Sequence, residues 1–241
     1  MRILLVAATA AEIGPLMAEL RRTGDGGPRT TRYVGRGHDV DVLVSGVGMV
    51  ATATWCAQAL SRDRYDLALN LGVCGAFDRT LSLGSVVHVV SDRFSELGAE
   101  EGSAADGSAA DGGAEDGAAF LTVQQLGLLG DDEPPFAGGR LVNQSPPAGA
   151  VLNNLRAVDG ITVNTVHGRE QSIACVTERF SPQVESMEGA AFMYACLVHG
   201  QPFAQVRAVS NFVERRNRAA WKLAEAIEQL GATALRVLSE S

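Results

Sequence analysis

The stretch Phe203-Ala-Gln-Val-Arg-Ala-Val-Ser-Asn-Phe212 decides the architecture that the sequence predicts. It is an apolar run with β-branched residues, which indicates a buried strand, and it ends in a Ser–Asn step. A dense polar segment and then a helical pattern follow it. In open α/β sheets, ligands bind just outside the carboxyl ends of the strands. We therefore expect Asn211, at the end of this strand, to contact a ligand.

Other apolar runs alternate with helical patterns along the chain. They predict strands at 3–8, 39–45, 67–71, 85–91 and 161–166, and helices at 13–20, 50–60, 121–129, 170–180, 185–197 and 221–238. Two glycine-containing segments, 24–28 and 72–76, are predicted to interrupt this pattern as a break and as a turn that closes a strand. Repeated strand–turn–helix units are typical of an α/β fold with a largely parallel sheet.

Bulk composition limits the class of protein. A chain of 241 residues suits one α/β domain, and we predict a single domain over 1–241. The net charge of −8 argues against a nucleic-acid surface. The first apolar run, of about seven residues, is too short to span a membrane. No cysteine pair has CxxC spacing, so we expect reduced core thiols and a cytoplasmic protein, with the thiols at Cys56, Cys74, Cys175 and Cys196.

Residues 102–116 differ in composition from the rest of the chain. They read Gly-Ser-Ala-Ala-Asp, Gly-Ser-Ala-Ala-Asp, Gly-Gly-Ala-Glu-Asp and hold no large apolar side chain. Such a segment buries too little apolar surface to offset the conformational entropy that it would lose on becoming ordered. We expect a flexible, low-complexity surface insertion, and the alternative is a lid over a site.

Glu12 follows the first predicted strand and has two interpretations. It stands three residues after Thr9, the spacing of a helix capping box, which is a structural role. A carboxylate at the mouth of this strand can also take a proton from water as a general base. The sequence leaves both roles open.

Gly46-Val-Gly48-Met-Val-Ala51 matches G-x-G-x-x-A between a predicted strand and a predicted helix, with Asp66 downstream. This pattern is the dinucleotide-binding fingerprint, which normally occupies the first strand–helix turn. Here that first turn, residues 7–12, holds no glycine. Dinucleotide binding is thus the alternative to a backbone turn beside a sugar or an anion.

Met187-Glu188 stands at a predicted helix start, where an acid is favourable in itself. The small residues that follow would also allow this carboxylate to accept two sugar hydroxyls, with Met187 on the ribose face. His167 follows a predicted strand, with Asn164 and Thr165 beside it, and it is a site candidate, although a lone histidine is more often structural. We find no metal-site spacing, P-loop or G-x-S-x-G motif.

Together these residues resemble the nucleoside phosphorylase and nucleosidase superfamily, over nearly the whole chain apart from the insertion. The superfamily motifs are Glu12, Ser45-Gly-Val-Gly48, Gly72-Val-Cys-Gly75, Met187-Glu188 and Arg207-Ala-Val-Ser-Asn211. The resemblance implies a three-layer α/β fold with a central mixed, mostly parallel sheet flanked by helices. It also implies a small-molecule nucleoside substrate, no cofactor or metal, and a homo-oligomer.

Longer strings resemble the futalosine hydrolase family within this superfamily. They are 91–99, 163–168, 185–191 and 210–218. This resemblance implies hydrolysis of the N-glycosidic bond of futalosine to hypoxanthine and dehypoxanthine futalosine, in menaquinone biosynthesis. The alternative is another purine nucleosidase or phosphorylase, of inosine or methylthioadenosine type.

The resemblance also assigns roles to single residues. Glu12 would activate water, Glu188 would hold the ribose, and Asn211 would stabilise the departing base. Related adenine-releasing nucleosidases carry Asp at the last position, whereas a neutral amide suits a 6-oxopurine with its two acceptors. An amide can also pair with adenine, so this position alone does not exclude an adenine nucleoside. Further substrate-binding residues are expected at Gly72, Val73, Phe94, Val163, Asn164, Thr165, Val166, His167, Met187, Arg207 and Ser210, and a benzoate end near Phe94, Arg93 or the Arg215, Arg216 and Arg218 cluster.

Overall fold

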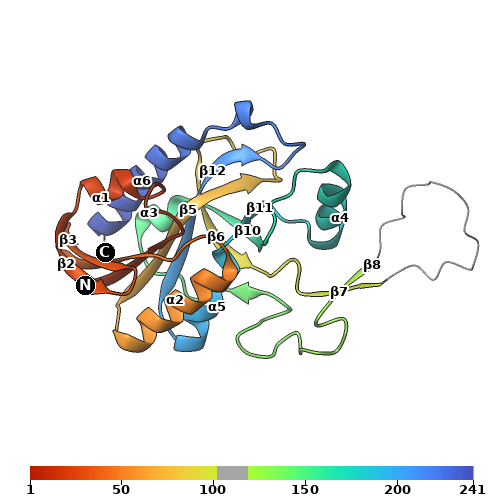
Figure 1. Ribbon diagram of the computed structural model, residues 1–241, viewed down its shortest axis with the longest axis horizontal. Coiled ribbons are helices and arrows are strands. Elements are labelled where there is room, and N and C mark those ends of the chain that lie inside the picture. The colour runs from red at the N-terminus through yellow and green to blue at the C-terminus, as the bar shows by residue number, and fades with distance from the viewer. Residues whose placement is uncertain (102–118, 241) are drawn as a thin grey trace, which may run out of the picture.

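A computed structural model describes residues 1–101 and 119–240 (Figure 1). The insertion predicted at 102–116 lies outside these residues. The strands are β1 (Arg2–Ala7), β2 (Arg21–Gly27), β3 (Thr30–Gly35), β4 (His38–Val44), β5 (Leu67–Ala76), β6 (Val86–Asp92), β7 (Gly98–Glu101), β8 (Ala119–Thr122), β9 (Leu141–Val142), β10 (Arg156–Thr162), β11 (Val184–Ser186) and β12 (Phe203–Phe212). The helices are α1 (Gly14–Ala18), α2 (Met49–Arg62), α3 (Ala150–Asn154), α4 (Glu170–Phe180), α5 (Gly189–His199), α6 (Leu223–Glu240) and the 3-10 turn η1 (Arg218–Ala220).

A mixed sheet forms the centre of the molecule. Its strands follow the order β11-β10-β6-β12-β5-β1-β4-β3-β2. The inner neighbours β4, β1, β5 and β12 run parallel to one another, whereas β2 and β3 add an antiparallel edge. β11 also pairs antiparallel with β5, so that β5, β12, β6, β10 and β11 close into a ring. The carboxyl ends of β5 and β12 thereby meet β11.

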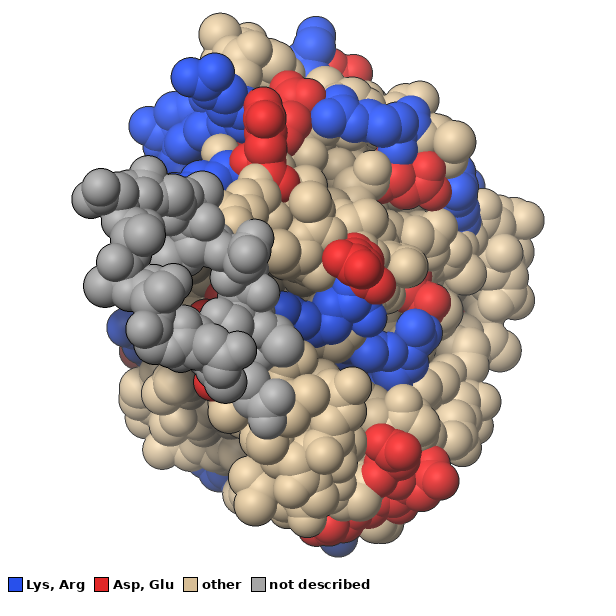
Figure 2. Space-filling view, turned by 90° about the vertical axis from the view of Figure 1, so that its right-hand side faces the viewer, with Lys and Arg blue, Asp and Glu red and all other residues tan. Residues whose placement is uncertain are grey.

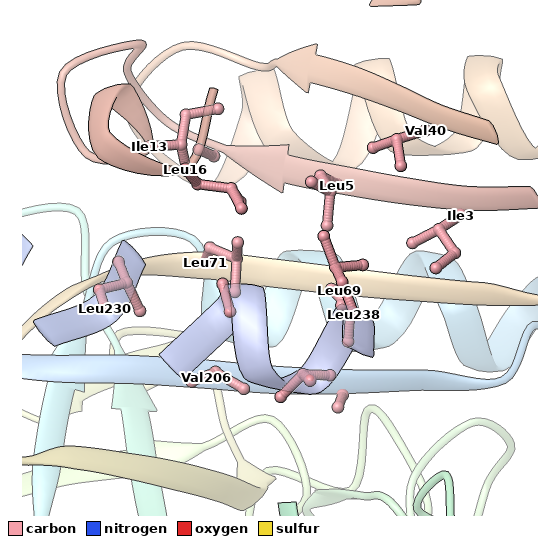
Figure 3. Packing of buried hydrophobic residues seen from close by; sticks show 14 of the residues in the cluster. Ile3, Leu5, Ile13, Leu16, Val40, Leu69, Leu71, Val206, Leu230 and Leu238 are labelled. Carbon is pink, nitrogen blue, oxygen red and sulfur yellow. The ribbon is translucent and has the colours of Figure 1, made fainter. Parts of the chain in front are cut away.

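Helices cover both faces of this sheet and make three layers (Figure 1). Alternate residues of β1 point to opposite faces, as the two-residue period of a strand requires. Ile3 and Leu5 belong to the same apolar cluster as Leu230 and Leu238 of α6, part of which Figure 3 draws, whereas Leu4 and Val6 join a second cluster with residues of α2 and α5. The three-layer α/β fold expected from the sequence is confirmed.

Several local predictions were wrong, for physical reasons. The break predicted at 24–28 lies within a hairpin of β2 and β3, which is largely exposed and so lacks an apolar alternation. The helix predicted at 121–129 is the end of β8 followed by turns. The turn predicted at 72–76 continues β5, because Gly75 and Ala76 pair with β11 and β12.

Three element boundaries also differ from the prediction. β10 ends at Thr162, so residues 163–168 form a loop. Glu185 lies in β11, and the helix predicted from 185 begins only after Glu188. α6 begins at Leu223, so Trp221 precedes it. Within residues 1–101 and 119–240, no helix is both long and apolar enough to cross a membrane.

Candidate active site

The carboxyl end of β5, from Gly72 to Gly75, connects the residues that the sequence singled out. In the sheet, Gly72 pairs with Arg207 of β12, and three residues later Gly75 pairs with Asn211 on one side and Glu185 on the other. Three strand residues span roughly 10 Å. The two ends of this segment therefore lie about a nucleoside's length apart.

Glu12 lies at the first end and contacts β5 directly. Its Oε2 accepts hydrogen bonds from the Thr9 backbone N–H at 2.9 Å and from the Thr9 hydroxyl at 3.0 Å. Its Oε1 accepts the Val73 N–H at 3.3 Å. The Thr9–Glu12 contact that the capping-box spacing predicts is present, but α1 begins at Gly14 after an uncapped Ile13, so it caps no helix.

Gly72 allows two charged side chains to approach the same backbone position. A Cβ there would lie against Nη1 of Arg207 and 3.0 Å from Oε1 of Glu12. Arg207 is only 1% exposed, donates to the side-chain oxygen of Asn70, and has Nη1 4.0 Å from Glu188 Oε2. A fixed, buried guanidinium therefore lies between the two acids, and only glycine leaves it room.

Glu188 precedes the first residue of α5 and is buried, with 6% exposure. Its Oε1 accepts the Gly48 N–H at 3.0 Å. Burial raises the pKa of this carboxyl, the Arg207 charge opposes that rise, and the neighbouring charge of Glu12 adds to it. Glu12 and Glu188 are thus electrostatic neighbours.

The same contact explains the Gly46-Val-Gly48 motif. Gly46 and Gly48 have φ of 92° and 97°, which only glycine adopts easily, and the turn directs a backbone N–H at the Glu188 carboxylate. The anion beside this turn is therefore a side chain of the protein. Of the two interpretations of the motif, the structure favours the turn near an anion over the dinucleotide site.

Asn211 lies at the other end of the segment, beside Gly75. A Cβ on Gly75 would lie 3.2 Å from Asn211 Nδ2 and 3.5 Å from Glu185 Cγ. Glu185 Oε2 is 2.6 Å from His167 Nδ1, and its Oε1 accepts the His167 backbone N–H at 3.1 Å. A small pocket of about 50 Å³ is lined by Gly75, Val166, His167, Glu185, Asn211, Phe212, Glu214, Arg216, Asn217 and Trp221.

The remaining predicted site residues occupy more varied positions. The Ser210 hydroxyl donates to Asn211 Oδ1 at 2.8 Å, with the Cys74 carbonyl oxygen 3.2 Å from the same Oγ, so it holds the amide. Val163 is fully buried, and Met187 packs against its cluster. Asn164 donates from Nδ2 to Glu96 at 3.0 Å.

Thr165 is exposed, and Phe94 is not among the residues that line the Asn211 pocket. Phe94 pairs with Thr162 in an isolated bridge and has its ring 6.2 Å from that of Tyr194. It lines a separate cavity of about 290 Å³ with Arg93 and Arg179. Basic and acidic side chains are interspersed over the face that Figure 2 shows.

Three contributors were missed as site residues in the sequence. Glu185 was predicted only as the first residue of a helix, because nothing local reveals that β11 pairs with β5. Asn70 lies inside the predicted strand 67–71 and was not singled out, since its role depends on Arg207. Trp221 was placed in a helix, although it lines the Asn211 pocket. A buried polar residue inside an apolar run was the one usable signal.

The family model of the Phosphorylase superfamily matches residues 2–240. A futalosine hydrolase from Streptomyces coelicolor is 33% identical over 201 residues, covering 79% of this chain and 74% of the relative. One from Thermus thermophilus is 30% identical over 206 residues, covering 82% and 80%. The solved 5′-methylthioadenosine/S-adenosylhomocysteine nucleosidase of Colwellia psychrerythraea, in complex with adenine, has a TM-score of 0.76 at 20% identity, covering 100% of this chain and 97% of that one. The chain belongs to the phosphorylase superfamily.

Proposed function

We propose that the protein hydrolyses the N-glycosidic bond of futalosine, releasing hypoxanthine and dehypoxanthine futalosine for menaquinone biosynthesis. The similarity to two futalosine hydrolases over most of the chain supports this proposal. The observation that carries it is the neutral amide of Asn211 in the pocket beside Gly75, at the other end of the Gly72–Gly75 segment from Glu12 and Glu188.

In the proposed mechanism, the sugar and the water bind at the Gly72 end of the Gly72–Gly75 segment, and the base binds at the Gly75 end. Departure of the base leaves positive charge on the anomeric carbon and its ring oxygen, as in other glycoside hydrolyses. Glu188 accepts the ribose hydroxyls and stabilises this charge, with Met187 against the sugar. Glu12 orients a water and takes its proton as the oxygen bonds to the anomeric carbon. Arg207 does not touch the substrate in this account, and it positions Glu188 through the buried charge contact.

Water, and not phosphate, is the proposed nucleophile. A phosphorylase needs free backbone N–H groups and cations to bind phosphate. Here the Val73 N–H already donates to Glu12, and Arg207 is engaged by Asn70 and Glu188. Arg36 pairs with Glu19 at 3.6 Å. Because the Glu12 carboxylate occupies the N–H group that a phosphate would need, the site favours hydrolysis over phosphorolysis.

Asn211 bears on the choice of base. An amide N–H donates to N7 or O6 of a 6-oxopurine without introducing a charge that would repel O6. Ser210 donates to Asn211 Oδ1, which leaves the amide nitrogen as the donor toward a ligand. Hypoxanthine is accordingly the proposed leaving group. The segment from Val166 to His167 would lie along its other side.

Product analysis in phosphate-free buffer tests the function. Purified protein incubated with futalosine should release hypoxanthine at a rate that added phosphate does not change. No sugar 1-phosphate should appear. Release of adenine from methylthioadenosine, with futalosine untouched, would contradict the proposal.

Glu12→Gln tests the mechanism at saturating futalosine. We expect kcat to fall by about 10²–10⁴-fold, the usual contribution of a general base. Glu19→Gln serves as the control, because Glu19 is an exposed acid that pairs with Arg36, and this variant should keep wild-type kcat. A Glu12→Gln enzyme close to wild type would refute the general-base role.

The second candidate is a methylthioadenosine-type nucleosidase, which the fold shared with the Colwellia enzyme favours. Asn211→Asp separates the two, because an acid at this position can protonate adenine. We expect this variant to lose futalosine turnover and to gain turnover of methylthioadenosine. A variant unchanged with both substrates would show that Asn211 does not select the base.

We also propose that residues 1–241 act as one domain and assemble into a homo-oligomer in the cytoplasm. Val47 and Val50 support the assembly, because they are 57% and 80% exposed beside the Gly48–Glu188 contact. Light scattering on the purified protein should give a mass that is a multiple of 25.2 kDa. A monomer that retains activity would contradict the assembly.

A further inference from the structure

We propose that His167, held by Glu185, is the general acid that protonates the departing base. This inference rests on the proposed nucleosidase function and adds a residue to its chemistry. The sequence marked His167 only as a contact along the purine.

The Glu185 carboxylate fixes the His167 ring. One carboxylate oxygen lies 2.6 Å from Nδ1, and the other accepts the backbone N–H of the same residue at 3.1 Å. Both oxygens of Glu185 thus hold one residue, and Glu185 itself is 3% exposed. In this arrangement Nδ1 donates its proton to the Glu185 carboxylate, so Nε2 is the ring nitrogen that remains for proton exchange. Nε2 has no hydrogen-bond partner within the described parts of the chain.

The strand register brings this dyad to Asn211. Gly75 of β5 is paired with Glu185 on one side and with Asn211 on the other. Glycine is the one residue with no side chain to fill the gap between them. His167, Glu185 and Asn211 consequently line the same pocket. A purine that reaches the Asn211 amide also reaches His167.

The chemistry needs a donor that Asn211 does not supply. Cleavage of the bond from C1′ to N9 leaves the electron pair on the base, and protonation of the base makes it a better leaving group. An amide donates a hydrogen bond but does not give up its proton. Asn211 Nδ2 also donates to the Phe212 carbonyl at 3.0 Å, so the backbone shares that amide. Histidine is the side chain suited to exchange a proton near neutral pH.

The proposed step balances as follows. The C1′–N9 bond breaks and its electron pair passes into the purine ring. The proton on His167 Nε2 moves to N7 of that ring, so hypoxanthine leaves neutral and His167 becomes neutral. The water oxygen bonds to C1′ and its proton moves to Glu12. Solvent then returns a proton to His167 and accepts the one on Glu12.

A purely structural role makes a different prediction. The His167–Glu185 pair would then only anchor the loop 163–168 to β11. Any side chain that keeps the bond from the Nδ1 position to Glu185 would preserve activity. His167→Asn provides this separation, since its amide N–H occupies the Nδ1 position while the Nε2 atom is lost.

Steady-state kinetics on futalosine and hypoxanthine titration of the intact protein test the proposal. We expect His167→Asn to lower kcat by about 100-fold or more, the low end for a general acid. KM and the hypoxanthine Kd should stay within about threefold of wild type. His167→Gln, which keeps a donor near Nε2 but no transferable proton, should lose kcat similarly and serves if the first variant does not fold. His199→Gln, an exposed histidine at the end of α5, is the control that should change nothing.

Two results would overturn the assignment. One is a His167→Asn enzyme with kcat within about threefold of wild type. The other is a loss of hypoxanthine affinity as large as the loss of kcat, which would make His167 a binding residue. A wild-type protein that releases no hypoxanthine from futalosine would instead remove the proposed function, so the two failures are distinguishable.

Discussion

Asp92 gives a prediction about stability that the structure makes quantitative. This carboxyl is 1% exposed at the end of β6. Oδ1 accepts hydrogen bonds from the Thr162 hydroxyl at 3.0 Å and the Arg93 backbone N–H at 2.8 Å, and Oδ2 accepts from Gln205 Nε2 at 2.9 Å. Burial outweighs these contacts and raises the pKa of Asp92 from 3.8 to about 7.

The sign of the pH dependence follows from that direction. Between the two pKa values the native state holds a proton that the unfolded state has released, so stability falls as pH rises. The cost is absent below pH 3.8 and complete above about pH 7. At about 1.36 kcal/mol per pKa unit, ionised Asp92 costs about 4 kcal/mol of unfolding free energy at pH 8.

Asp92→Asn should remove most of this cost. The Asn carbonyl can take the place of Oδ1. The new amide N–H can donate to Gln205 Oε1, a buried atom with no partner among the described residues, once the Gln205 amide turns over so that its oxygen replaces Nε2 at this contact. We expect the variant to be more stable than wild type by about 2–4 kcal/mol at pH 8 and equal to it near pH 4.

Urea unfolding at several pH values between 4 and 8 measures the difference. Asp39→Asn, an exposed acid on β4, is the matched control and should stay within about 0.5 kcal/mol of wild type throughout. A variant of Asp92 that is no more stable than wild type at pH 8, or whose stability gain does not change with pH, would refute the reasoning.

Three further predictions test the site and the core. Gly72→Ala should abolish most activity and cost about 1–3 kcal/mol of stability through overpacking, whereas Gly24→Ala, with open space around it, should do neither. Hypoxanthine should quench the fluorescence of wild type and of Trp55→Phe, but not of Trp221→Phe, because Trp221 lines the Asn211 pocket. Ellman's reagent should react rapidly with one thiol per native chain, at exposed Cys175, since burial shields the other three and raises their pKa.

The parts of the fold that the sequence predicted are those whose pattern follows from the faces that are buried, both faces for β1 and one face for α4. β1 and α4 came within a residue or two of their observed ends, because continuous apolar runs and helical faces follow directly from that burial. The hairpin of β2 and β3 was not predicted, because it forms an edge of the sheet beside β4 and many of its side chains face solvent. Propensity alone does not specify a strand of that kind.

The site was predictable where a residue's role depends on its own position, and not where it depends on register. Asn211 and Glu12 were found because each follows a strand that the pattern reveals. Glu185 was not, since its importance arises from pairing across Gly75, and no local feature encodes which strand β11 joins.

The Gly46-Val-Gly48 turn shows how a motif acquires its meaning from a distant partner. The local backbone shape of this turn allows an N–H group to bind an anion, and the glycine pattern specifies nothing more than that shape. In the folded chain, Glu188 occupies that position from a helix 140 residues away in sequence. The N–H opposes the rise in the pKa of Glu188 that burial and the charge of Glu12 cause. A glycine turn of a shape that can receive an anion thus holds in place one of the two acids on which the proposed hydrolysis depends.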